Sequence, residues 1–435
     1  MSHLLTMLAL QAQVATTGVP PQGTGVVIIS TLLKIVIIFT IYLLSVMALT
    51  LAERKISAWI QGRIGPNRAG PWGLLQPIAD GVKNIAKEET YPGGANRPMF
   101  ILAPAIAFTT AMLAWAVIPF AAPWDSAWGR IPMAVAPLPI GFLYILAIAS
   151  LGVYGLVLAG WASNNKYSLL GGLRSSAQMV SYEISMGMST IPVLLLAGNV
   201  AMDRVIEQQA LHGWNILNLT IAGFVFIVAS FAETNRVPFD LPEAESELVA
   251  GYHSEYSAMK FSMFFIAEYS NMITASALMA TLFFGGWDIP FTLWDNVAPH
   301  TGIKTVLTGL FFALKVAFFC VSFMWVRWTL PRFRYDQLMS LGWKVLLPMM
   351  LAYILIIATA VLIFRNLGLE QVRWVGISAF GLALFAVNIV LSIVVFWFLD
   401  RGRVISPASS RLQADALERL RAARYRSTLS AEAGD

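Results

Sequence analysis

Long runs of apolar residues, separated by short clusters of charged and polar residues, follow one another along most of the chain. Each run is close to the roughly 20 residues that a helix needs to cross a bilayer. The pattern therefore predicts nine helices, of which the fifth is the shortest. They are expected at residues 26–51, 99–122, 138–161, 176–198, 218–232, 260–285, 304–326, 345–365 and 374–399.

The composition agrees with a protein that spans a membrane. Hydrophobic residues make up 57% of the chain and charged residues 12%, whereas a soluble domain has about 25% charged residues. The predicted fold class is therefore an all-α integral membrane protein. Residues 1–25 contain no lysine or arginine ahead of the first apolar run, which argues against a cleaved signal peptide and favours a short lead-in.

The basic residues are distributed unevenly among the segments between these helices. If five of the segments share one side of the membrane, that side holds 22 of the 29 Lys and Arg residues. Because positive residues remain on the cytoplasmic side, the pattern predicts an N-terminus outside and a C-terminus inside. In a bacterial inner membrane, the expected location, these are a periplasmic N-terminus and a cytoplasmic C-terminus. The five segments are residues 52–98, 162–175, 233–260 and 327–344 and the tail after residue 399.

The first of these cytoplasmic segments, residues 52–98, contains an amphipathic stretch. Leu74, Ile78, Val82 and Ile85 recur on one helical face, which is typical of a helix lying in the membrane interface. On this pattern alone the helix is either a simple surface anchor or part of a functional site.

Residues 233–256 concentrate negative charge. They hold 6 of the 24 acidic residues in the chain. A charge at the centre of a bilayer costs on the order of 3 kcal/mol, so these carboxylates must line water, face a partner or border an internal cavity. Apolar residues among them, such as Phe239 and Leu248, favour a cavity wall over a solvated acidic face. The acidic residues are Glu233, Asp240, Glu243, Glu245, Glu247 and Glu255.

The spacing within this acidic loop predicts a helix that begins at Asp240. An Asp followed three positions later by Glu243 resembles a capping box. Glu243 and Glu247 would then share one helical face, with Glu245 turned away.

Ionisable residues also occur inside the predicted spans, namely Glu183, Glu268 and Lys315, with Tyr269 next to the second. Such groups are tolerated in a membrane only when they are paired or hydrated. A carboxylate that changes between its neutral and charged forms can carry protons, whereas a buried Glu–Lys pair would only fix helix packing. Both interpretations remain open at this point.

The sequence predicts no redox centre and no metal site. Its single cysteine, Cys320, cannot supply the ligands of an iron–sulfur cluster. The four histidines are scattered, and none falls mid-span where it could hold a haem. Any electrons must therefore be carried by another component.

Six motifs, in their order along the chain, resemble one family of membrane subunits, the H subunits of the proton-translocating NADH:quinone oxidoreductase, respiratory complex I. The mitochondrial counterpart of this family is subunit 1. The resemblance covers about residues 50 to 350, and the joint occurrence of the motifs makes it specific. The motifs are LAERK, QGRIGPNRAGPWGLLQPIAD, VSYE, AETNRVPFDLPEAESELVAGYHSEY, FFIAEYSNM and PRFRYDQLM.

The resemblance implies an eight-helix domain over residues 26–365, at the junction of the membrane and peripheral arms. In this family the protein forms most of the quinone chamber and its opening to the lipid. The expected activity is that of an enzyme subunit without a redox centre, which couples the reduction of quinone by NADH-derived electrons to proton translocation. This chain would bind no cofactor and no nucleic acid. Quinone would be the substrate, and the FMN and iron–sulfur clusters would belong to partner subunits, which include the peripheral-arm quinone-site subunits and small neighbouring membrane subunits.

The resemblance also assigns site residues, none of them catalytic. The expected quinone-chamber residues are Arg54, Arg63 and Asp80. The expected proton-coupling residues are Glu183, Glu233, Arg236, Asp240, Glu243, Glu245, Glu247, Glu268, Tyr269 and Lys315. Carboxylates that lie close together titrate as a unit, so such a cluster would respond to charge that appears during quinone reduction.

The C-terminal part departs from the family pattern. Residues 366–400 predict an extra transmembrane helix, and residues 401–435 predict a basic cytoplasmic tail. Two other functions remain as alternatives. A stand-alone proton-coupled transporter usually shows an internal repeat and broken paired helices, and neither is clear here. The membrane anchor of a related hydrogenase-type complex would work without quinone.

Overall fold

The described part of the chain is a bundle of helices with two short hairpins. The computed structural model describes residues 24–242, 245–290, 292, 294–296, 298–369, 372–374, 377–400 and 418–419. The predicted lead-in before Thr24, and the predicted basic tail apart from residues 418–419, lie outside this range. All nine predicted helices are present, which confirms the fold class. They are α2 (Thr24–Ile60), α4 (Arg97–Leu113, continued by the 3₁₀ turn η2, Ala114–Val117), α5 (Gly141–Ala162), α6 (Lys166–Ala197), α9 (Thr220–Glu233), α11 (Ala258–Phe283), α12 (Gly302–Thr329), α14 (Leu347–Asn366) and α15 (Ala379–Asp400).

Shorter elements connect these helices. The helical ones are η1 (Pro71–Gly73), α3 (Gln76–Ala86), α7 (Met202–His212), α8 (Asn215–Asn218), α10 (Glu245–Leu248), η3 (Gly251–His253), α13 (Tyr335–Ser340) and the π-helical turn η4 (Leu341–Leu346). The strands are β1 (Trp124–Ser126) and β2 (Gly129–Ile131), paired antiparallel, and β3 (Arg373–Trp374) and β4 (Ile377–Ser378), also paired antiparallel.

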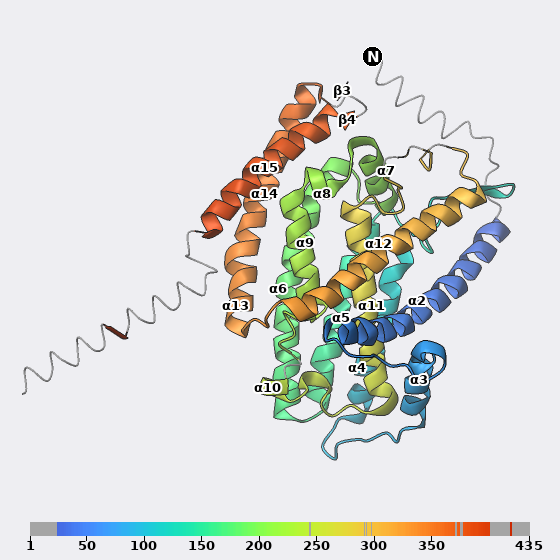
Figure 1. Ribbon diagram of the computed structural model, residues 1–435, viewed down its shortest axis with the longest axis vertical. Coiled ribbons are helices and arrows are strands. Elements are labelled where there is room, and N and C mark those ends of the chain that lie inside the picture. The colour runs from blue at the N-terminus through green and yellow to red at the C-terminus, as the bar shows by residue number, and fades with distance from the viewer. Residues whose placement is uncertain are drawn as a thin grey trace, which may run out of the picture.

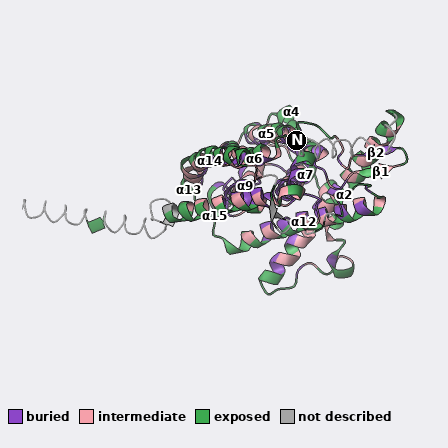
Figure 2. Ribbon diagram, turned by 90° about the horizontal axis from the view of Figure 1, so that it is seen from above, coloured by how far each residue is buried: buried purple, intermediate pink, exposed green. Residues whose placement is uncertain are grey.

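Seven helical segments in the described residues are long and apolar enough to cross a membrane. The two remaining predicted spans differ from them for separate reasons. Helix α9 has only 14 residues, as its short apolar run predicted. Helix α11 has 26 residues, of which 19 are buried, and it carries more polar side chains because it faces other helices rather than lipid. Figure 2 shows that the outward faces of α13 and α14 are largely exposed.

The connecting segments separate into two groups at opposite ends of the bundle. Helices α3 and α10 lie at one end, and α7, β3 and β4 lie at the other (Figure 1). This arrangement agrees with the grouping of loops predicted from their basic residues. The direction of the bundle across the membrane stays a prediction.

Several boundaries differ from those expected. Helix α2 continues through Ile60 and therefore includes Glu53, and α6 begins at Lys166, ten positions before the predicted start. The helix predicted to begin at Asp240 is wrong, because α10 begins at Glu245 and has four residues. The carboxylate of Asp240 is engaged by Arg332 at 3.1 Å instead of capping a helix.

The interfacial helix is confirmed as a helix, α3. None of its residues is buried, and Ile78, Val82 and Ile85 are exposed along one face. Pro77 lies in its first turn, where a proline is tolerated. Whether this face lies on a membrane stays a prediction.

The ninth helix, α15, is attached to the bundle by a buried polar residue. Asn388, in the middle of this apolar helix, has no exposed surface. The hydroxyl of Tyr353 on α14 donates to its Oδ1 at 2.6 Å, and its amide nitrogen donates to the carbonyl oxygen of Asn218. Since an unpaired amide would be costly inside a membrane, these bonds fix where α15 packs.

Candidate functional site

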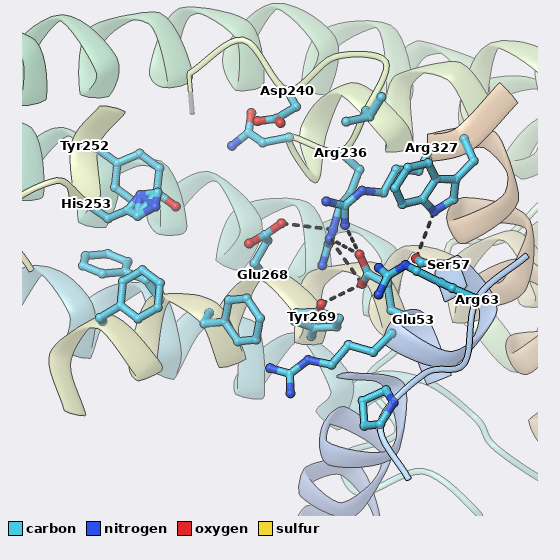
Figure 3. Close-up of a pocket in the computed structure, with 18 residues that line it drawn as sticks. Glu53, Ser57, Arg63, Arg236, Asp240, Tyr252, His253, Glu268, Tyr269 and Arg327 are labelled. Carbon is cyan, nitrogen blue, oxygen red and sulfur yellow. Dashed lines mark hydrogen bonds and ion pairs between the residues drawn. The ribbon is translucent and has the colours of Figure 1, made fainter. Parts of the chain in front are cut away.

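A cavity of about 590 Å³ lies at the end of the bundle that carries α3 and α10. One end of the cavity is charged and the other is aromatic (Figure 3). Its walls come from α2, α11, the end of α12, η3 and the segments that follow α2 and α9. The lining residues are Glu53, Arg54, Ser57, Arg63, Pro66, Asn235, Arg236, Val237, Asp240, Tyr252, His253, Phe261, Phe264, Phe265, Glu268, Tyr269, Arg327 and Trp328.

The charged end is organised around Glu53, which is 4% exposed. The hydroxyl of Tyr269 donates to its carboxylate at 2.6 Å, and Arg327 forms an ion pair with it. Nη1 of Arg236 lies 3.4 Å from the same carboxylate. Glu53 therefore brings together α2, α11, α12 and the segment after α9.

Arg236 is shared between two carboxylates. Its Nε lies 3.0 Å from Oε1 of Glu268, on the other side from Glu53, and its guanidinium lies 4.4 Å from the centre of the Tyr269 ring. A buried arginine between two carboxylates can strengthen its contact with either one when the charge on the other changes. Glu53, Arg236, Glu268, Tyr269 and Arg327 are called the charged cluster below.

The aromatic end consists of Tyr252, His253, Phe261, Phe264 and Phe265. The ring of His253 is stacked on that of Phe261, with 5.4 Å between their centres. Burial lowers the pKa of His253 to about 4, so its imidazole is neutral near pH 7. This end therefore offers flat rings and no charge.

A second, smaller cavity of about 80 Å³ lies next to the first. Asn235, Tyr252, Phe264 and Glu268 line both cavities. A cavity needs roughly 10–15 Å³ to hold one water molecule, so the smaller cavity has room for several water molecules. Its wall also includes Glu233, so Glu268 lines both cavities and shares the smaller one with a second acidic residue.

A family model described as NADH dehydrogenase matches residues 33–358 of this chain. The chain belongs to this family. The H subunit numbered 1 of the NADH-quinone oxidoreductase of Cytophaga hutchinsonii is 51% identical to it over 327 residues, which are 75% of this chain and 95% of the relative. The corresponding H subunit of Leptospira biflexa is 52% identical over 327 residues, 73% and 90% of the two chains. NADH-quinone oxidoreductase subunit 8 of Rhodothermus marinus is 51% identical over 336 residues, 75% and 96% of the two chains.

Membership of the NADH dehydrogenase family agrees with the resemblance seen in the sequence. The chain is a multi-pass membrane protein and a subunit of an oxidoreductase. The match ends at residue 358, inside α14, so that α15 lies beyond it.

The family's expected quinone-chamber residues lie together. Arg54 and Arg63 line the large cavity. Asp80 is not among its lining residues, but its carboxylate accepts from Arg54 at 2.6 Å and from Gln76 at 3.1 Å. Asp80 therefore fixes α3 against α2 beside the cavity.

The expected proton-coupling residues divide into those at the cavities and those elsewhere. Arg236, Asp240, Glu268 and Tyr269 line the large cavity, and Glu233 lines the small one. These five therefore lie on the walls of two cavities that share lining residues.

Glu183, Glu247 and Lys315 are not among the lining residues of either cavity. Glu183 accepts a hydrogen bond from the hydroxyl of Ser150 inside the bundle. The carboxylate of Glu247 is 45% exposed and lies 2.6 Å from Arg174.

Lys315 belongs to α12, and its ammonium donates to backbone carbonyl oxygens of the segment that follows the far end of α11. Glu243 lies outside the described residues, and Glu245 is described only as the first residue of α10. The predicted pairing of Glu243 with Glu247 therefore stays a prediction.

Sequence reasoning missed Glu53, Arg327 and His253 as site residues. The pattern predicts Glu53 and Arg327 in loops, because both follow the ends of apolar runs. His253 is one of four scattered histidines, so nothing in the sequence marks it. The available signal for Glu53 was its position beside Arg54 in the LAERK motif. No local signal pairs it with Arg327, which is 274 positions away.

Proposed function

We propose that this chain is the quinone-chamber subunit of a proton-translocating NADH:quinone oxidoreductase. The observation that carries the proposal is a large cavity with one charged and one aromatic end, which shares Glu268 with a smaller neighbouring cavity. Its volume of about 590 Å³ lies within the roughly 300–1,000 Å³ that is usual for small-molecule sites.

The two ends of the cavity suit the two parts of a quinone. Aromatic side chains pack well against a flat ring or an isoprenoid tail. The arginines and hydroxyl groups of the charged end can donate hydrogen bonds to carbonyl oxygens. Electrons would reach the quinone from an iron–sulfur cluster of a partner subunit, and that assembly would also hold the FMN.

The charged cluster would convert quinone reduction into proton uptake. Reduction to quinol adds two electrons and two protons, so negative charge appears in the chamber before it is neutralised. That charge would compete with Glu268 for Arg236, and a released Glu268 would favour its protonated form. The proton could then pass towards Glu233 through water in the small cavity, since both residues line it.

The proposal includes an orientation. The end of the bundle with α3, α10 and the large cavity would face the cytoplasm of a bacterial inner membrane, where the peripheral arm would dock. The N-terminus would be periplasmic and the C-terminus cytoplasmic.

Arg236→Gln tests the proposal in the assembled complex. NADH:quinone activity should fall at least ten-fold, while NADH oxidation by an artificial acceptor stays near normal, because only the first reaction needs the chamber. Arg204→Gln serves as the control, since Arg204 is a half-exposed residue of α7 paired with Glu207 at 2.7 Å. Equal loss of both activities would indicate failed assembly, and unchanged quinone activity would refute the proposed role of the chamber.

A further inference from the structure

Gln178, a residue of α6 with no exposed surface, contacts the backbone on both sides of Arg236. Its Nε2 lies 2.8 Å from the carbonyl oxygen of Ala232 and 2.8 Å from that of Phe239. The same nitrogen lies 3.1 Å from Oδ1 of Asn235. The two N–H groups of this buried amide are therefore shared among three acceptors at the start, the middle and the end of the segment that carries Arg236.

Ser175, one turn earlier on α6, holds the same segment. Its hydroxyl oxygen accepts from Nδ2 of Asn235 at 3.1 Å. Asn235 has φ of 51°, the left-handed conformation that asparagine adopts more easily than most residues. The turn at Asn235 ends α9 and sends the chain into the wall of the large cavity, so Arg236 follows directly from a backbone conformation that α6 stabilises.

We propose that Gln178 is the positioning residue that keeps Arg236 between Glu53 and Glu268. This inference rests on the proposed function of the charged cluster. The contacts of Arg236 with the two carboxylates are unequal, 3.4 Å to Glu53 and 3.0 Å to Glu268. A backbone shift of about 1 Å would change which carboxylate it favours, and errors of about that size can lower a rate roughly 100-fold.

Helix α6 contacts the segment that carries Arg236 at a further point. Glu183 lies five positions after Gln178 on the same helix. Between them, the ring of Tyr182 lies 5.9 Å from that of Phe239, one of the residues whose carbonyl Gln178 holds. The segment with Arg236 is therefore held by α6 through its backbone and through a side chain.

The chain offers a matched control in Gln209 on α7, which is 1% exposed. Its Nε2 donates to the carbonyl oxygen of Thr281 at 2.8 Å, and its Oε1 accepts from the backbone nitrogen of Gly285 at 2.9 Å. It therefore does the same kind of work as Gln178, with the same burial, at the opposite end of the bundle. Replacing each by Met removes the amide and nearly keeps the volume.

The experiment compares Gln178→Met, Gln209→Met and Arg236→Gln in the whole membrane-bound complex. Both Met variants should lower the apparent Tm by similar amounts, because each leaves buried backbone groups without a hydrogen-bond partner: carbonyl oxygens for Gln178, and a carbonyl oxygen and N–H groups for Gln209. Gln178→Met should lower kcat for quinone reduction about ten-fold with little change in KM, and should shift the pH profile in the direction seen for Arg236→Gln. Gln209→Met should stay within two-fold of the unmodified complex with an unmoved profile.

If the two Met variants lose the same fraction of turnover with unmoved pH profiles, Gln178 is merely structural and the inference is overturned. Should Gln178→Met fail to assemble, Ser175→Ala makes a smaller change in the same contact and should still shift the pH profile, with about a three-fold loss. An unmoved profile in that variant overturns the inference as well. The Arg236→Gln variant tests the proposed function separately from the role of Gln178. If Arg236→Gln leaves quinone reduction unchanged, the proposed function is refuted.

Discussion

Charged side chains from other segments lie near both ends of α11, Arg236 at one end and Lys315 of α12 at the other, and the two places differ in what surrounds the charge. At the cavity end, Arg236 is divided between Glu53 and Glu268, and the group borders the two cavities. At the far end, the ammonium of Lys315 lies 2.8, 2.9 and 2.6 Å from the carbonyl oxygens of Phe284, Gly286 and Asp288. Both charges are held within an apolar bundle, but the first is shared between titratable partners and has adjoining volume.

The difference follows from hydrogen-bond counting. A lysine ammonium has three donors, and at the far end three backbone acceptors receive them. Backbone carbonyls do not titrate, so these three hydrogen bonds have one stable arrangement, although the carboxylates of Asp288 and Asp295 also act electrostatically on the ammonium. In the charged cluster Arg236 lies between two carboxylates, each of which can gain a proton, so the cluster has several stable arrangements. A buried charge in a membrane protein is therefore a candidate for function when its partners can change and room exists for water or a ligand beside it.

The largest loss of turnover is expected for Glu53→Gln. Neutralising Glu53 leaves Arg236 and Arg327 without their shared carboxylate, which is the most disruptive change available because a partner of a buried charge is removed. Quinone reductase activity should fall at least ten-fold in an assembled complex, measured against oxidation of NADH by an artificial acceptor. Glu207→Gln, at the half-exposed pair with Arg204, is the control and should have normal activity. Near-normal turnover in Glu53→Gln would remove the main reason for distinguishing the two ends.

The second prediction concerns the far end. Lys315→Met should lower the apparent Tm of the complex by a few degrees, because three carbonyl groups lose a charged donor. Turnover at a permissive temperature should stay within two-fold, with an unmoved pH profile. A shifted pH profile would show that Lys315 takes part in proton coupling, as the family resemblance predicts. It would also contradict the distinction between a charge held by backbone carbonyls and one shared between carboxylates.

A third prediction uses the aromatic end of the cavity. Burial lowers the pKa of His253 to about 4, below the value of about 6.5 expected when the chain is unfolded. The native state therefore binds fewer protons than the unfolded state, and stability is lost as the pH falls from about 6.5 towards 4. The loss should reach about 2 kcal/mol at pH 5.

His253→Phe should remove this acid-dependent loss and keep the stacking on Phe261. The measurement is the difference in apparent Tm between pH 7 and pH 5 for both proteins. Parallel pH dependence in the two would show that the imidazole is already protonated or accessible, and that this end of the cavity is not apolar.

The smallest effect is expected for Glu247→Gln. Its carboxylate is 45% exposed and paired with Arg174, and such surface pairs contribute about 0–1 kcal/mol. Turnover and its pH optimum should remain within experimental error. A clear shift of the optimum would instead support the sequence-based grouping of Glu247 with Glu243 in one titrating unit, and would extend the responsive region from the cavity to the surface.

Much of the fold could be predicted from the sequence because the pattern of apolar residues within one segment is enough to predict a helix there. Each of the nine predicted helices is present, since an apolar run in a bilayer must satisfy its own backbone hydrogen bonds and the helix does so within the run. The same locality explains the errors. A charged or polar residue at the edge of an apolar run predicts a helix boundary, so the predicted α2 ends before Glu53 and the predicted α6 begins too late. The structure places such residues against partners from other helices.

What the sequence determined by itself was the class of protein, its nine main apolar helices, the grouping of its loops and a list of ionisable residues in unusual surroundings. Only the tertiary structure decided which of these act together. Glu53 meets Arg327 across 274 positions and Tyr269 across 216, whereas Lys315 and Glu247 are not among the residues that line either cavity. The physical reason is that hydrophobic patterning is read along one helix, while the pairing of a buried charge depends on which other helices pack against it.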